Sequence, residues 1–344
     1  MSNAAETRPV ERLTGLQLPL GIVLFIISEV LAGVITALVA FAMWGTPPSP
    51  GAASTAGGVP DLVGMLAGAA LSLAGLWLIV RVVGRRKQVT ELAAGRAIPE
   101  LAAGLLIGVV LMSAVIGILA LLGMYRVEGL GTVGGVVAGL AVGIGPGVME
   151  EVLFRGFALR LVDRWTGTVP ALAITAIFFG LAHLGNPDAT VFGAVAIMVE
   201  AGILLGAAYL LTGRLWLAIG IHAAWNFTLG GIYGAEVSGS GRSAGLLRST
   251  ISGPSLLTGG EFGVEGSLIT ILVCGSAGAV LLILARRAGR IRGIYRRPAA
   301  EPSGGPSGGP TTEPGTEPSA GPTSEPGSGP TAGPPTGTSA GTAG

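Results

Sequence analysis

Val133–Leu161 reads VGGVVAGLAVGIGPGVMEEVLFRGFALRL, a glycine-rich apolar stretch with two adjacent glutamates and an arginine in its second half. A helix that crosses a bilayer needs about 20 mostly apolar residues, so this stretch is long enough to span. Gly145-Pro146-Gly147 interrupts it just before the glutamates, and a proline there frees a backbone carbonyl and favours a kink. The stretch therefore predicts a kinked membrane span that carries charged side chains.

The rest of the chain has the same apolar character. Of its 344 residues, 50% are hydrophobic and only 11% are charged, and the mean hydropathy is +0.72. Soluble domains carry about 25% charged residues, so the composition indicates a membrane protein. The formal net charge of +1 argues against a nucleic-acid partner. The single cysteine, Cys274, excludes an intrachain disulfide and a cysteine-based zinc cage.

Eight apolar stretches meet the length criterion, which predicts an all-α fold, a polytopic membrane helix bundle of about eight transmembrane helices. They are Leu18–Trp44, Leu62–Val83, Leu101–Met124, Val133–Leu161, Val169–Leu184, Thr190–Leu211, Leu215–Tyr233 and Ser267–Ala285. Glycine and alanine are frequent within them, and such small residues let membrane helices pack closely.

Lysine and arginine are distributed unequally between the two sets of loops. They precede the first span, follow the second, sixth and eighth, and flank the end of the fourth. The opposite loops hold only Arg126, Arg242 and Arg248. Because positive residues favour the cytoplasmic side, eight spans place both termini in the cytoplasm. We therefore expect a multi-pass protein of the cell (plasma) membrane.

This interpretation divides the chain into six segments. They are a cytoplasmic N-terminal segment (1–17), N-terminal transmembrane helices (18–132), core helices (133–233), an extracytoplasmic loop rich in glycine and serine (234–266), the last transmembrane helix with its basic flank (267–297) and a C-terminal tail (298–344). The tail is rich in Pro, Gly, Ser and Thr and has no aliphatic side chain larger than alanine, so it is predicted to be disordered.

The charged cluster of the fourth span has helical spacing. Glu151 and Arg155 are four residues apart, so they share a helix face and can form a structural ion pair. Glu150 is rotated by about 100° from Glu151, which leaves it as a carboxylate able to act as a base. The alternative is that the cluster is only the cytoplasmic end of a helix with interfacial charges.

The chain has two histidines, and both fall inside predicted spans. His183 ends the string FGLAH (residues 179–183), and His222 begins the string HAAWN that ends at Asn226. A lone buried histidine more often makes a hydrogen bond between helices than takes part in catalysis. Two of them, with none elsewhere, favour a function. His222 and Asn226 are four residues apart and share one helix face.

These side chains suit peptide hydrolysis in two ways. A carboxylate with a nearby imidazole can deprotonate water, and a His/Asn pair can donate hydrogen bonds to the oxyanion that forms when water attacks an amide. Alternatively, Glu150, His183 and His222 form a ligand set for zinc or another divalent metal. Residue types alone leave both schemes open. Two further acids inside predicted spans, Glu29 and Glu200, receive no assigned role.

The three motifs, in this order on separate helices, resemble those of the CPBP family of intramembrane proteases. This family includes the type II CAAX prenyl endopeptidases and their bacterial relatives, the bacteriocin-processing and Abi-like immunity proteins. The resemblance covers about Gly145–Thr228. It implies that Glu150 activates the attacking water with help from His183, and that His222 and Asn226 stabilise the oxyanion. It also implies that Glu151 and Arg155 hold the site together.

The resemblance thus implies an intramembrane endopeptidase, described in the family as a metalloprotease, that acts on a peptide or protein substrate at the lipid bilayer. The alternative is a non-enzymatic immunity or regulatory membrane protein that binds a peptide or a partner in the same groove. A transporter with a Glu/His proton relay ranks last, because it would show paired broken helices in two inverted repeats, and only one span here is broken.

Overall fold

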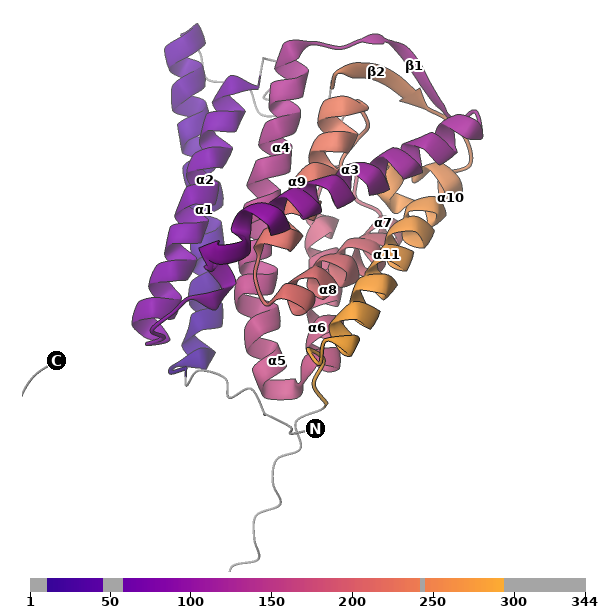
Figure 1. The fold of residues 1–344 in the computed structure, drawn as a ribbon. Coiled ribbons are helices and arrows are strands. Elements are labelled where there is room, and N and C mark those ends of the chain that lie inside the picture. The colour runs from indigo at the N-terminus through magenta and orange to yellow at the C-terminus, as the bar shows by residue number, and fades with distance from the viewer. Residues whose placement is uncertain (1–10, 46–57, 242–244, 294–344) are drawn as a thin grey trace, which may run out of the picture. The chain divides into compact units, whose positions relative to one another are not determined.

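The computed structural model describes residues 11–45, 58–241 and 245–293. Within this described part, seven helices are long and apolar enough to cross a membrane. They are α1 (Thr14–Trp44); α2 (Val59–Leu78) with the π-helix η1 (Ile79–Val83); the 3₁₀ turns η2 (Thr90–Leu92) and η3 (Ala94–Arg96) with α3 (Ala97–Leu121); α4 (Val133–Glu151) with the π-helix η4 (Val152–Leu159) and α5 (Arg160–Thr166); α6 (Thr168–Ala182) with the 3₁₀ turn η5 (His183–Gly185); α7 (Val191–Ile197) with the π-helix η6 (Met198–Gly202) and α8 (Ile203–Thr212); and α11 (Leu268–Arg287). The predicted all-α polytopic bundle is confirmed (Figure 1).

A shorter helix lies among these. It consists of α9 (Trp216–Asn226) and its π-helical continuation η7 (Phe227–Ile232), and it corresponds to the predicted span Leu215–Tyr233. None of its residues is exposed, and it packs against α3, α4 and α8. The helix that carries His222 and Asn226 is therefore enclosed by its neighbours.

Glycines of α4 allow α9 and η7 to pack closely against α4. On α4, Gly139, Gly143 and Gly147 form one stripe at four-residue spacing. A Cβ atom added at Gly139 would lie 2.2 Å from the Cα atom of Gly231, and one at Gly147 would lie 2.9 Å from the Cα atom of Ala223. Only glycine fits such distances, so this stripe sets the separation of the two helices.

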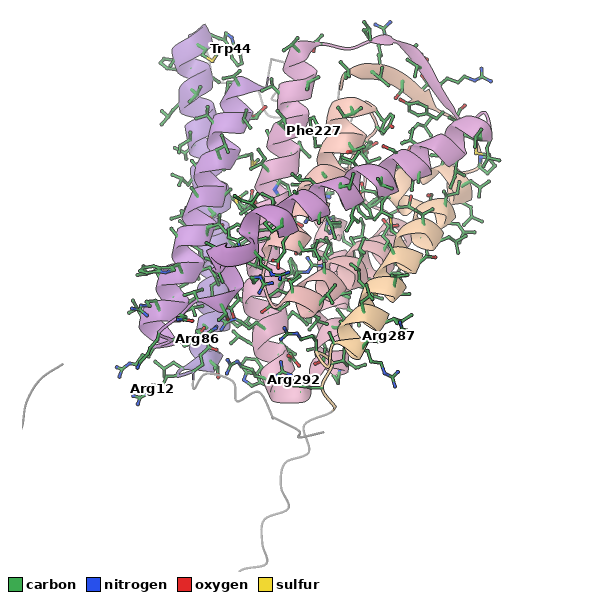
Figure 2. The ribbon with its side chains drawn as sticks, viewed as in Figure 1. Arg12, Trp44, Arg86, Phe227, Arg287 and Arg292 are labelled. Atoms are coloured by element: carbon green, nitrogen blue, oxygen red, sulfur yellow. The ribbon has the colours of Figure 1, made fainter. Side chains whose placement is uncertain are left out.

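Arginines gather at one end of the bundle. In Figure 2 the labelled side chains of Arg12, Arg86, Arg287 and Arg292 lie toward the lower end of the view, and Trp44 lies at the upper end. This one-sided distribution agrees with the sidedness expected from the loops. Which compartment the arginine end faces stays a prediction.

Buried ion pairs join separate segments at this arginine end. Arg160 pairs with Glu11 and donates a hydrogen bond to the side-chain oxygen of Gln17 at 2.8 Å. Glu11 also pairs with Arg164 at 2.9 Å. Burial alone would raise the pKa of Glu11, but the charges of Arg160, Arg164 and Arg86 outweigh burial and hold this pKa below its ordinary value.

The opposite end contains structure that the sequence did not predict. The strands β1 (Tyr125–Leu130) and β2 (Leu247–Ile251) form a two-stranded antiparallel ribbon. The stretch predicted as a loop, 234–266, includes β2, the short helix α10 (Ser255–Thr258) and the 3₁₀ turns η8 (Gly260–Phe262) and η9 (Val264–Gly266). The predicted tail, 298–344, lies outside the described residues.

Candidate functional site

Glu151 and Arg155 form a buried ion pair at the junction of α4 and η4. The Oε1 atom of Glu151 accepts a hydrogen bond from Arg155 at 2.7 Å, as the four-residue spacing predicts. The guanidinium of Arg155 also donates to the carbonyls of Ala201 and Gly202, at 3.2 and 3.3 Å, and its central carbon lies 4.5 Å from the centre of the Phe179 ring. Arg155 therefore connects η4 with η6 and α6.

The two glutamates face the two nitrogens of one imidazole. The Oε1 atom of Glu151 lies 2.9 Å from Nδ1 of His222, a contact that the sequence did not predict. The Nε2 atom of the same ring lies 4.0 Å from Oε2 of Glu150. Because Nδ1 is committed to the Glu151 carboxylate, Nε2 can donate a hydrogen bond only when the ring is doubly protonated.

Glu150 is the more accessible of the two glutamates. Its side chain is 20% exposed, whereas that of Glu151 is fully buried. The Oε2 atom of Glu150 is itself buried, and among the described residues it has no hydrogen-bond partner. Glu29 of α1 lies near enough for the charge of Glu150 to act on it, so Glu29 belongs to the surroundings of this carboxylate. Of the pair, Glu150 is the group able to meet a water molecule or a substrate.

His183 joins the group through Phe179. It lies at the end of α6, where its Nδ1 atom is 2.8 Å from the carbonyl oxygen of Phe179. The Phe179 ring centre lies 5.0 Å from that of His183 and 6.0 Å from that of His222. Phe179 therefore lies against both imidazoles. Asn226 lies one turn beyond His222 and donates to the carbonyl of Val142 at 3.3 Å.

Hydrogen bonds within the protein orient the two histidines that the sequence suggests as zinc ligands. His183 and His222 each use Nδ1 in a hydrogen bond within the protein. Across the described residues, no three His, Cys, Asp or Glu side chains gather in a way that would hold a metal. The hypothesis that Glu150, His183 and His222 bind a metal stays a prediction.

Glu265 and Glu200 are two further buried carboxyls outside the motif residues. Glu265 in η9 accepts hydrogen bonds from Nε1 of Trp225 at 2.7 Å and from Oγ of Ser238 at 3.0 Å. Burial raises the pKa of Glu265, although these hydrogen bonds and the charge of His183 oppose the change. Glu200 on η6 is fully buried and lies near enough for the charge of Glu265 to act on it. In the sequence, Glu200 stands out as an acid inside a predicted span. Glu265 does not, because it is one acid in a stretch predicted to be a glycine-rich loop.

A cavity of about 1260 Å³ lies at the end of the bundle that carries the ribbon. Its walls include four acids, Glu128, Asp188, Glu236 and Glu261, and one arginine, Arg248. None of the six motif residues lines it. The cavity therefore borders the loop that carries Glu265 rather than the group around His222.

Comparison with known proteins assigns the core segment to a family. Residues 132–228 match the family model described as type II CAAX prenyl endopeptidase Rce1-like. All six motif residues lie within this segment. No curated protein and no solved structure gives a significant match to the chain. This match confirms the resemblance drawn from the three motifs for residues 132–228, which are similar to the type II CAAX prenyl endopeptidase family.

Proposed function

We propose that this chain is an intramembrane endopeptidase in which Glu150 activates water. The observation that carries the proposal is the placement of Glu150 and Glu151 on the two nitrogens of His222, inside a segment that matches a protease family. The substrate is a peptide or protein at the membrane. The protein lies in the plasma membrane with both termini in the cytoplasm, which the arginine end of the bundle supports.

In the proposed reaction, the Glu150 carboxylate takes a proton from water, and the resulting hydroxide attacks the carbonyl carbon of the scissile amide. His183 assists in holding this water. The proton then passes to the amide nitrogen, the carbon–nitrogen bond breaks, and an acid and an amine are released. Deprotonation by a positioned carboxylate contributes about 10²–10⁴-fold to such rates.

The oxyanion that forms in this step meets two donors. The side chain of Asn226 has two N–H groups, and the carbonyl of Val142 takes only one of them. Nε2 of His222 becomes a donor when the ring is an imidazolium, and the carboxylate of Glu151, 2.9 Å from Nδ1, balances that charge. Donors placed in this way stabilise the transition state more than the ground state.

Cleavage of a peptide library by purified protein tests the proposal. We expect Glu150→Gln and His183→Ala to lower the cleavage rate, by about 10²-fold or more for Glu150→Gln, without changing the melting temperature. Glu128→Gln, an exposed acid on β1, is the matched control and should cleave as wild type. Equal rates for wild type and Glu150→Gln would refute the mechanism.

Two further outcomes of the same assay are informative. If these variants lose cleavage but keep the cellular phenotype of the wild type, the protein acts as a non-enzymatic immunity or regulatory factor. Cleavage measured in the presence of a strong chelator tests whether the protein uses zinc or another divalent metal. Loss of cleavage that returns on adding zinc would establish a metal requirement, and unchanged cleavage would exclude one.

A further inference from the structure

Phe262–Ser267 is buried throughout, although it lies in a glycine-rich stretch just before α11. The ring of Phe262 packs on Gly193 of α7, where an added Cβ atom would lie 2.4 Å from it. On the other side, the hydroxyl of Thr270 in α11 donates to the carbonyl of Val264 at 2.6 Å. These contacts hold the backbone on both sides of Glu265.

The Glu265 carboxylate connects this segment with α9. Its Oε1 atom accepts from the indole N–H of Trp225 at 2.7 Å and from the hydroxyl of Ser238 at 3.0 Å, and its Oε2 atom accepts from the backbone N–H of Ser238. Trp225 lies between His222 and Asn226 in sequence, so the bond holds α9 beside both proposed oxyanion donors. A buried carboxylate with three donors is a strong link, because hydrogen bonds to a charged group contribute more than neutral ones.

The same loop also reaches the end of α6. The carbonyl of Ser238 accepts from the side-chain amide of Asn186 at 2.6 Å, and the backbone N–H of Asn186 donates to the carbonyl of His183 at 3.2 Å. Hydrogen bonds therefore run without interruption from Trp225 through Glu265, Ser238 and Asn186 to His183. This chain of hydrogen bonds ties together the two helices that carry His183 and His222.

We propose that Glu265 is a positioning residue that holds the His183 end of α6 and the His222 face of α9 at the separation that peptide hydrolysis needs. The inference rests on the proposed function above. Glu265 itself lies outside the segment that matches the family model. It acts through Trp225 and Ser238 and does not touch the substrate.

Two variants of similar size separate hydrogen bonding from space filling. Glu265→Gln keeps an acceptor oxygen for Trp225, whereas Glu265→Met fills the space without an acceptor. We expect Glu265→Met to lower kcat by about 100-fold with KM changed by less than about twofold, because a small misplacement of reacting groups costs about this much. Glu265→Gln should stay within about tenfold of wild type. Glu261→Gln, an exposed acid four residues earlier, is the control and should leave both constants unchanged.

Hydrogen exchange provides a readout that does not depend on cleavage. In Glu265→Met the backbone amides of 186–189 and 237–240 should exchange faster than in wild type, while those of α3 keep their rates. A fully active Glu265→Met, or equal kcat values for the Met and Gln variants, overturns the positioning role. If wild type cleaves no peptide but exchange still quickens in Glu265→Met, the proposed function is wrong and the structural link alone stands. If exchange is unchanged, the link itself is wrong.

Discussion

A single oxygen of Glu151 serves two partners, Arg155 at 2.7 Å and His222 at 2.9 Å. The first contact neutralises a buried guanidinium, and the second fixes the orientation of an imidazole. Removal of one partner from a buried ion pair leaves an uncompensated charge and costs about 3–5 kcal/mol. Glu151 therefore supports both the stability of the fold and the geometry of the site, and substitutions can separate the two roles.

We expect Glu151→Gln to lower the melting temperature and to abolish cleavage. Adding Arg155→Met removes the unpaired cation, so the double variant should recover most of the lost stability. It should remain inactive, because His222 still lacks the carboxylate that orients it. Thermal unfolding in detergent and peptide cleavage, measured on the same preparations, check both expectations. A double variant that cleaves as fast as wild type would show that Glu151 does not orient His222.

The sequence predicts residue contacts only where they are local. The Glu151–Arg155 pair follows from a spacing of four on one helix. The Glu151–His222 contact joins residues 71 positions apart, and the Trp225–Glu265 bond joins residues 40 apart, so both depend on how helices pack. Glu261 and Glu265 look alike in the sequence, yet one is exposed and the other buried.

At the scale of helices, the glycine stripe on α4 decides how closely α9 and η7 approach. An alanine at Gly139 would place its Cβ atom 2.2 Å from the Cα atom of Gly231, so one helix must move. At Gly117 of α3, no atom lies within 4 Å of an added Cβ. Inside a helix, glycine is less stable than alanine by about 0.5–1 kcal/mol, so the two substitutions should change stability in opposite directions.

We expect Gly139→Ala to lower both the melting temperature and the cleavage rate, because it separates α4 from the helix that carries His222. Gly117→Ala should leave cleavage unchanged and keep or slightly raise the melting temperature. Thermal unfolding and kcat measured side by side test this pair. Equal behaviour of the two variants would contradict the role of the stripe.

Spans could be predicted from the sequence because apolar length is a local property. The π-helical segments could not, since they widen a helix by one residue per turn without changing its apolar character. Three of them adjoin the site: η4 follows Glu151, η7 follows Asn226, and η6 supplies the carbonyls that bind Arg155. The β-ribbon was missed because its two strands lie more than 100 residues apart in the chain.

For the molecule as a whole, the arginine end depends on ion pairs between distant segments. Glu11 precedes α1, while its partners Arg160 and Arg164 lie on α5. The pKa of Glu11 is lowered in the folded protein, so its ionised form contributes stability above the unfolded value of about 4.5. This contribution is lost as the pH falls through the lower pKa of the folded state.

We therefore expect Glu11→Gln to lower the melting temperature near pH 7 and to have a progressively smaller effect below about pH 4.5. Melting curves of wild type and variant across this range, in the same detergent, measure the difference. Glu128→Gln at the other end of the bundle is the control. A difference between Glu11→Gln and wild type that stays constant from pH 7 to pH 4 would rule out the proposed linkage.

The enclosure of α9 and η7 has a consequence for biogenesis. This helix runs only from Trp216 to Ile232, presents no exposed residue, and is absent from the seven helices that meet the length and hydropathy criteria for crossing a membrane. It is therefore poorly suited to enter the bilayer on its own and depends on α3 and α4, which are synthesised before it. His222 can meet Glu150 and Glu151 only after α9 has packed against α4, so a newly made chain can form the candidate site only once these helices have come together.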